Sequence, residues 1–153
     1  MPQLVKGGKH VFGWSRVGAT GGVRIPPEAA QEYGLESDLE VILVSASRTS
    51  GGFCMMREDH MKESPLGDIF REFPELAAAE GLGKVRRWKS RFYTRVSVRS
   101  GYFALPAGED PLYGVRPGDL LLAVRGSYLG PSFLAKGPLL EEAHQHPGLE
   151  IFE

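Results

Sequence analysis

Residues 21–47 read GGVRIPPEAAQEYGLESDLEVILVSAS, and residues 101–127 read GYFALPAGEDPLYGVRPGDLLLAVRGS. The two stretches align without a gap at an offset of 80 residues, with six identities in 27 positions. Apolar positions also meet apolar positions, and such agreement on one offset indicates an internal repeat. The identical positions are Gly21, Pro26, Tyr33, Gly34, Val44 and Ser47, each with its counterpart 80 residues further on.

Each copy is predicted to form a β-β-α-β-β unit. In the first copy, the glycines within residues 18–22 indicate a turn, because glycine adopts positive φ without strain. A short helix is expected to begin at Pro27 and to end at Gly34, since proline favours the first turn of a helix and glycine its C-terminal cap. The apolar pattern predicts strands at residues 9–17, 22–26, 39–46 and 53–56.

The second copy repeats this pattern with different local chemistry. Its helix, expected at residues 107–113, is the weaker of the two because Gly108 and Pro111 both oppose a helix interior. The predicted strands are residues 92–98, 102–105, 119–125 and 133–135. Together the copies predict a mainly β fold with short helices, packed about a pseudo-twofold axis.

The same patterns divide the chain into four segments. These are a first repeat at 1–56, a helical connector at 57–83, a second repeat at 84–137 and a tail at 138–153. The connector is expected to pack across the repeats or against a partner, because four of its apolar residues are spaced to share one helical face. Those residues are Ile69, Phe70, Phe73 and Leu76. The tail reads as a short helix at 139–144 followed by an apolar end.

Composition places the chain among folded proteins. Of its 153 residues, 42% are hydrophobic and 24% are charged, which is typical of a soluble globular protein. Cys54 is the single cysteine, which excludes an internal disulfide and fits a reducing compartment. No apolar run is long enough to span a bilayer, and the first residues lack a signal-peptide pattern. We therefore expect a cytoplasmic protein without a membrane partner.

Positive charge is concentrated at the front of each repeat. Residues 1–27 contain four basic and no acidic residues, and residues 81–108 contain seven basic and no acidic residues. The net charge of the whole chain is nevertheless −1, because the acids gather elsewhere. Because this concentration of cations occurs in both repeats, it favours a surface that faces phosphates. The alternative interpretation is that the cations lie on the solvent-exposed face of the strands.

Residues 17–26, VGATGGVRIP, followed by Tyr33, Gly34 and Leu35 and a strand from Leu39, resemble the AbrB/MazE/SpoVT swapped-hairpin domain. That family has a glycine turn, a strand ending in Ile-Pro, a short helix closed by Gly-Leu, an acidic turn and a further hairpin. The resemblance covers roughly two-thirds of the chain. The second copy keeps Gly101, Leu105, Pro106, Gly114, Val115, Gly118 and Asp119 at the matching positions.

The resemblance implies a small barrel in which two copies interleave their β-hairpins, here within one chain and with a helical insertion between the repeats. It also implies a DNA-binding transcriptional regulator, since arginines of the first hairpin reach the duplex in DNA-binding members of the family. The residues expected to contact phosphates of duplex DNA are Arg16, Arg24, Lys89, Arg91, Arg95 and Arg99.

Two departures from the family pattern keep a second function open. Gly22 and Tyr102 stand where a basic residue often follows the turn glycine, and the total charge is close to neutral. The alternative is a protein-interaction or ligand-binding barrel, such as an antitoxin-like partner, that no longer binds DNA. A homodimer and a protein partner held by residues 57–83 or by the tail also remain open.

Other chemistries find little support in the residue pattern. The glycines at 18–22 lack the Lys-Ser/Thr pair of a phosphate-binding loop, so a turn is the better interpretation. His144 and His146 do not form a set of three or four ligands at a recognised metal-site spacing. No nucleophile with a base at a known spacing stands out, and we therefore expect no enzyme activity, cofactor or metal.

Overall fold

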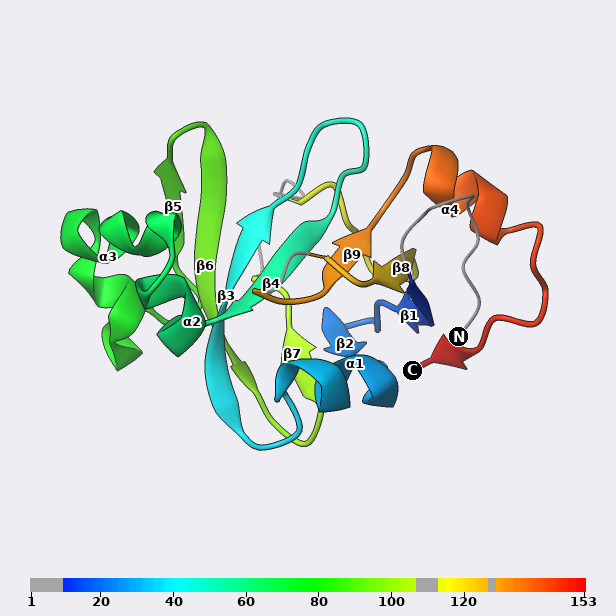
Figure 1. The fold of residues 1–153 in the computed structure, drawn as a ribbon, viewed down its shortest axis with the longest axis horizontal. Helices are drawn as coiled ribbons and strands as arrows, with labels where there is room; N and C mark the ends of the chain where they lie inside the picture. Colours follow the sequence, from blue (N-terminus) through cyan, green and yellow to red (C-terminus); the bar gives the residue numbers. More distant parts are fainter. Residues whose placement is uncertain (1–9, 107–112, 127–128) are drawn as a thin grey trace.

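A computed structural model describes residues 10–106, 113–126 and 129–153 and confirms a mainly β fold with a large mixed sheet and short helices (Figure 1). The strands are β1 (Val11–Arg16), β2 (Gly22–Arg24), β3 (Leu39–Ser45), β4 (Phe53–Arg57), β5 (Val85–Trp88), β6 (Arg91–Val98), β7 (Tyr102–Ala104), β8 (Leu120–Val124), β9 (Ser132–Leu134) and β10 (Ile151–Phe152). The α-helices are α1 (Pro27–Tyr33), α2 (Glu58–Lys62), α3 (Ile69–Glu72) and α4 (Pro138–Ala143). Three 3₁₀ turns complete the connector: η1 (Pro65–Asp68), η2 (Pro74–Ala77) and η3 (Ala79–Gly81).

Eight strands form one sheet in the order β10-β1-β8-β9-β4-β3-β6-β5, and β2 and β7 form a second sheet. Neighbouring strands are antiparallel except β1 and β10, which are parallel and make the large sheet mixed. The hydrogen-bonded order ends at β10 on one side and at β5 on the other. Among the described residues the sheet is therefore open, and the predicted barrel closure is not found.

Strands of one copy pair mainly with strands of the other. Between β2 and β7, Val23 lies opposite Phe103, and between β4 and β9, Phe53 lies opposite Phe133. Both pairs join residues that are 80 positions apart, so each pair joins equivalent positions of the two copies. A pseudo-twofold axis must pass through both pairs, because only an axis maps a residue onto its own partner.

Backbone hydrogen bonds follow the same symmetry. The N–H of Ile25 donates to the carbonyl of Gly101 at 2.8 Å, and the N–H of Leu105 donates to the carbonyl of Gly21 at 3.0 Å. The two bonds are equivalent: exchanging the copies replaces Ile25 by Leu105 and Gly101 by Gly21. The symmetry is approximate, since the β1–β8 and β3–β6 registers differ by one residue and β1 carries a register shift between Val11 and Gly13. The internal repeat is thus present in the strand pairing.

Helix α1 begins and ends where the sequence predicts. Pro27 is its first residue, and Gly34 follows its end at φ 68°, with its N–H bound to the carbonyl of Ala30. The helix expected at 107–113 lies largely outside the described residues, as does the start of the strand predicted from residue 9. At Gly114, φ is 67°, which matches the backbone of its counterpart Gly34.

One central core joins the two copies. The rings of Phe53 and Phe133 stack with centroids 5.1 Å apart, and Phe103 meets both with centroids at 5.8 Å. These rings lie among buried residues of both repeats, including Leu43 and Leu121. Because the repeats share this core, neither has a complete core of its own.

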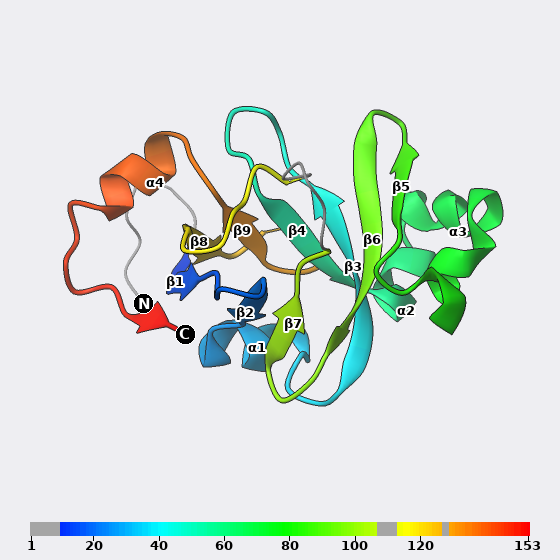
Figure 2. The ribbon, with the colours of Figure 1, turned by 180° about the vertical axis from the view of Figure 1, so that it is seen from behind.

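The connector and the tail pack on the face of the large sheet that points away from the central core, at opposite ends of the molecule (Figures 1 and 2). Met61, Ile69 and Leu76 of the connector pack on β3, β4 and β6, including Ile42 and Tyr93. The prediction that the connector packs across the repeats is confirmed, because β3 and β6 come from different copies. The tail packs Ala143 and Leu149 against Val11, Trp14, Leu122, Val124 and Leu134. None of the described helices is long and apolar enough to cross a membrane.

Candidate nucleic-acid interface

The six basic residues predicted to face DNA do not gather on one surface. Arg91 begins strand β6 and Arg99 follows its end, so about 26 Å of extended backbone separates them. Lys89 lies with Arg91 at the turn between β5 and β6, while Arg16 and Arg24 come from β1 and β2. Arg95 lies in the middle of β6. The interface that the sequence predicts as a single surface is therefore divided.

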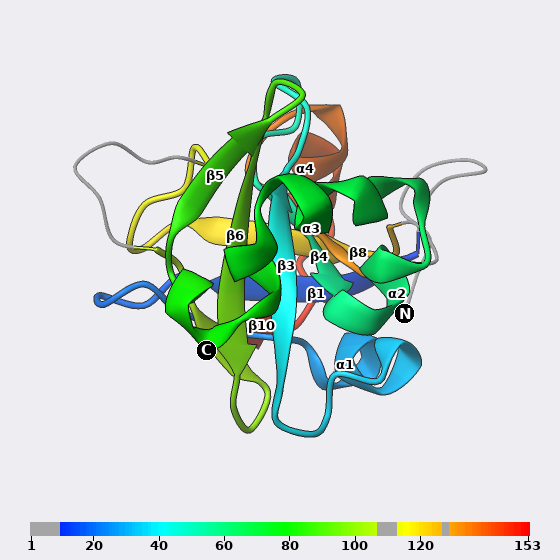
Figure 3. The same cartoon turned by 90° about the vertical axis from the view of Figure 1, so that its left-hand side faces the viewer.

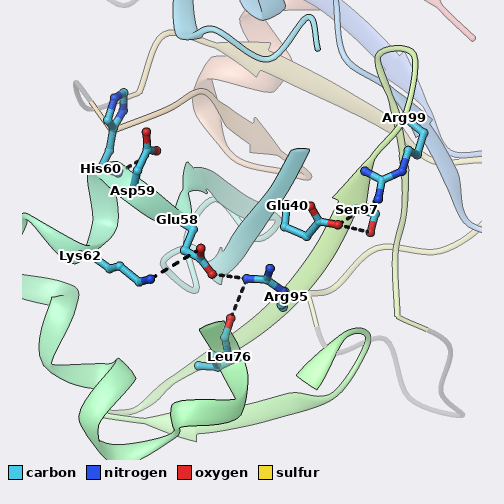
Figure 4. Close-up of polar contacts among 9 residues, drawn as sticks. All are labelled: Glu40, Glu58, Asp59, His60, Lys62, Leu76, Arg95, Ser97 and Arg99. Carbon is cyan, nitrogen blue, oxygen red and sulfur yellow. Dashed lines mark hydrogen bonds and ion pairs between the residues drawn. The ribbon is translucent and has the colours of Figure 1, made fainter. Parts of the chain in front are cut away.

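Arg95 is held inside the fold (Figure 4). Its Nη1 forms an ion pair with Glu58 and donates to the carbonyl of Leu76 at 3.0 Å. The side chain is only 11% exposed, and its Nε is buried without a partner among the described atoms. A guanidinium in this position holds the connector against β6, and it is not presented to a phosphate.

Arg99 is more exposed but is also engaged (Figure 4). Its Nη2 donates to Glu40 Oε1 at 2.9 Å, and its Nη1 donates to the carbonyl of Val98 at 2.8 Å. The arginine holds the pKa of the Glu40 carboxyl below its usual range, with a further contribution from the Ser97 hydroxyl. The Glu40 carboxylate thus neutralises the positive charge of Arg99, which binding to a phosphate would require.

Arg16 and Arg24 are engaged by the C-terminal residues. Arg16 Nε donates to Glu153 Oε1 at 3.0 Å, and the Arg24 guanidinium lies over the Phe152 ring, 5.4 Å from its centroid. The two arginines of the first hairpin are thus brought together, but residues 152–153 contact both of them.

Lys89 and Arg91 occupy the tip of the β5–β6 hairpin. Lys89 and Ser90 form the turn with φ values of 48° and 66°, and the Lys89 ammonium lies 4.4 Å from the centroid of the Trp88 ring. Arg91 donates from Nη1 to the carbonyl of Ser45 at 3.2 Å, which ties this hairpin to the end of β3. Neither residue forms an ion pair with a described acidic residue.

Beside this tip lies a cleft of about 520 Å³ between the β3–β4 and β5–β6 hairpins. Figures 1 and 3 show the two hairpin tips at the same end of the molecule. Three exposed cations, Arg48, Arg87 and Lys136, line the cleft, and its described lining contains no acidic residue. Three hydroxyls also line it, those of Ser45, Ser47 and Ser90. We call this cleft the basic cleft and include in the name Lys89 and Arg91, which lie on either side of its lining residue Ser90.

The wall of the basic cleft is fixed by glycine. Gly51 and Gly52 have φ values of 60° and 70°, which turn the chain sharply into β4. The N–H of Gly52 donates to the carbonyl of Tyr113 at 2.9 Å, and the N–H groups of Ala135 and Lys136 donate to the carbonyl of Ser50 at 3.0 and 2.9 Å. The loop that carries Arg48 and the segment that carries Lys136 are therefore held side by side.

Tyr113 anchors the floor of the basic cleft. Its hydroxyl lies 2.6 Å from the Thr94 hydroxyl, and burial raises the pKa of Tyr113 to about 12. The phenol therefore stays neutral near pH 7 and adds no negative charge to the cleft. Because the cleft brings cations of three segments together, an anion inside it would interact with several of them at once.

Sequence reasoning missed three cations of the basic cleft. Arg87 lies in the second basic stretch but was not among the expected contacts, whereas Arg48 and Lys136 lie outside both basic stretches. The one available signal is the repeat itself. It aligns Phe53 with Phe133 and so brings the segments before β4 and after β9 together at the axis.

Comparison of the chain with family models, with curated proteins and with solved structures finds no match. Within the described ranges, no three His, Cys, Asp or Glu side chains are grouped as metal ligands. The arrangement of cations, hydroxyls and backbone groups in the basic cleft is suited to binding a phosphate backbone.

Proposed function

We propose that this protein is a DNA-binding regulator that contacts backbone phosphates of duplex DNA through the basic cleft. The observation that carries the proposal is a cleft whose described lining contains three exposed cations and no carboxylate, with two further cations, Lys89 and Arg91, on either side of its lining residue Ser90. Phosphate contacts of this kind supply most of the affinity of non-specific DNA binding. Arg16, Arg95 and Arg99 are not part of the proposed interface, because carboxylates of the chain already pair with them, and Arg24 lies on β2, away from the residues that line the cleft.

A second part of the proposal concerns the type of fold. We assign the chain to the tandem swapped-hairpin type that resembles AbrB and SpoVT. The support comes from the exchange of strands between the copies and from the self-pairing of equivalent residues at Val23–Phe103 and Phe53–Phe133. A strand-exchanged pair of repeats places the β3–β4 hairpin of the first copy beside the β5–β6 hairpin that leads into the second.

A salt titration tests the proposal directly. The dissociation constant for a random-sequence duplex is measured by fluorescence anisotropy between about 50 and 200 mM salt, the range over which phosphate contacts change affinity most visibly. Five phosphate contacts predict a slope of about −4.5 in a plot of log K against log salt. Replacing Arg48, Arg87 and Lys136 together by alanine should reduce the slope to about −2, since about one unit is lost per contact.

Arg71→Ala is the matched control. Arg71 lies on α3 with its side chain 88% exposed and has one ion-pair partner, Asp68, at 3.7 Å. This variant removes one positive charge from the total and none from the basic cleft, so it matches the single variant Arg48→Ala, and its slope should not change. A loss of about one unit of slope in both single variants would show that net charge and not the cleft governs binding. Undetectable binding at 50 mM salt would favour the protein-interaction alternative.

A further inference from the structure

Strand β10 (Ile151–Phe152) lies parallel to β1 at its outer edge. Ile151 and Phe152 lie opposite Trp14 and Ser15, and the N–H of Trp14 donates to the carbonyl of Glu150 at 2.9 Å. This edge of β1 corresponds by the repeat to the outer edge of β6, which β5 covers. Both β1 and β6 therefore receive a strand in addition to those of the β-β-α-β-β unit.

The side chains around β10 recognise an aromatic ring followed by a carboxylate. Gly13 leaves room for the ring, since a Cβ built at this position would lie 2.9 Å from a Phe152 ring carbon and 2.8 Å from the Glu150 carbonyl oxygen. Arg24 lies over the Phe152 ring. Arg16 pairs with the Glu153 carboxylate, and the Tyr102 hydroxyl donates to the backbone oxygen of Glu153 at 2.8 Å.

The attachment of β10 is weaker than that of β5. Strand β5 pairs with β6 over four antiparallel residues and is joined to it by a tight turn. Strand β10 pairs over two residues in the parallel arrangement, which is less stable per residue. Ile151 is 44% exposed and the Glu153 side chain is 66% exposed. Little surface must therefore be uncovered to release this strand from β1.

We propose that the outer edge of β1 is a strand-acceptor site for an extended segment of a partner protein in which an aromatic residue precedes an acidic one. The C-terminal strand occupies the site as a tethered ligand of the same chemistry. Main-chain hydrogen bonds to β1 supply affinity, while Gly13, Arg24 and Arg16 select the ring and the carboxylate. The site shares no residue with the basic cleft, so it is independent of the proposed DNA-binding function.

Binding of a labelled peptide tests this inference. The peptide Pro-Gly-Leu-Glu-Ile-Phe-Glu, the sequence of residues 147–153, is titrated against the full chain and against the Phe152→Ala/Glu153→Ala variant. The tethered strand competes at an effective concentration in the millimolar range, so the variant should bind the peptide at least about tenfold more tightly than the original chain. A peptide with alanine in place of the phenylalanine should bind either protein at least about tenfold more weakly.

Four results would overturn the inference. The first is equal affinity of the variant and the original chain. The second is absence of binding to the variant at about 1 mM peptide while its thermal unfolding remains cooperative. The third concerns the original chain alone and applies even if the variant does not fold: excess peptide should release the chain's own β10, so the backbone NMR signals of Ile151 and Phe152 should move to the positions of an unpaired segment, and unchanged signals would exclude exchange at the β1 edge. A concentration-dependent dimer that is lost in the variant would identify a second copy as the donor and would contradict a heterologous partner.

Discussion

Phe53 and Phe133 face each other across β4 and β9, with ring centroids 5.1 Å apart and planes inclined by 24°. Phe53 and Phe133 are equivalent positions of the two copies. The copies therefore meet at the centre of the core through the same residue. Phe103 packs on both rings, and its backbone pairs with its own counterpart, Val23. The stability of both halves is therefore expected to depend on this group of rings.

Phe133→Ala should destabilise the entire protein. Phe133 is fully buried, and truncation of a buried phenylalanine costs about 3–5 kcal/mol of unfolding free energy. Because the repeats share one core, denaturant unfolding should remain a single transition by both fluorescence and circular dichroism. Leu82→Ala is the control, since Leu82 is 45% exposed and its loss should change stability by less than about 1 kcal/mol. Two separate transitions would contradict a shared core.

Gly52→Ala should lower stability more than Gly83→Ala. Both glycines have positive φ, at 70° and 77°, so both substitutions carry a similar backbone strain of about 1 kcal/mol. A Cβ at Gly52 would overlap the carbonyl oxygen of Phe133, whereas a Cβ at Gly83 would meet no atom within 4 Å. The difference between the two free energies of unfolding therefore measures the close approach of the cleft wall to β9. Equal effects would show that the loop relaxes freely.

Arg95→Ala should reduce stability without changing the salt dependence of DNA binding. Removal of the guanidinium leaves Glu58, which is 25% exposed, without its closest partner and frees the carbonyl of Leu76. We expect a loss of about 2 kcal/mol, less than for a fully buried pair. Thermal unfolding and the slope of the salt titration are the two measurements. A slope lowered by about one unit would show that Arg95 contacts a phosphate after all.

Stability should fall between pH 10 and pH 12 because of Tyr113. Burial raises the pKa of Tyr113 in the folded protein to about 12, whereas an unfolded tyrosine has its ordinary value of 10. Below pH 10 the phenol is protonated in both states, so its contribution is fully present there. As the pH rises toward 12, only the unfolded state releases the proton, and stability falls by about 2–3 kcal/mol. Urea titrations at pH 9 and pH 11 should show about half of this loss, about 1.4 kcal/mol, and Tyr113→Phe should remove that contribution.

Local signals predicted much of the fold. The glycine at the end of α1, the proline at its start and the alternating strands are set by residues close in the sequence, and the structure has them within one or two residues of the predicted bounds. The 80-residue offset predicted which strands correspond. The strands β5 and β10 were missed, because β5 has two arginines among its four residues and β10 is only two residues long.

The candidate site was harder to predict because it depends on what covers each strand. Alternation along β6 places Arg91, Arg95 and Arg99 on the same face as Tyr93, which a sequence reading can recognise. The connector then covers the middle of that face through Leu76 and Glu58. Of the three arginines, only Arg91 is next to residues that line the basic cleft, Ser90 and Phe92. Arg48 and Lys136 join it through contacts between residues far apart in the chain.

The interleaving of the repeats has a consequence for synthesis on the ribosome. Strand β1 has β8 as its antiparallel neighbour, and more than 100 residues separate Val11 from its partner Val124. The amino-terminal half therefore leaves the ribosome with apolar strand edges that its own residues do not cover. It can complete its strand pairing only after β8 has left the exit tunnel. A chain built in this way depends on slow, long-range pairing. Chaperone demand and sensitivity to premature termination should both be high for such a product.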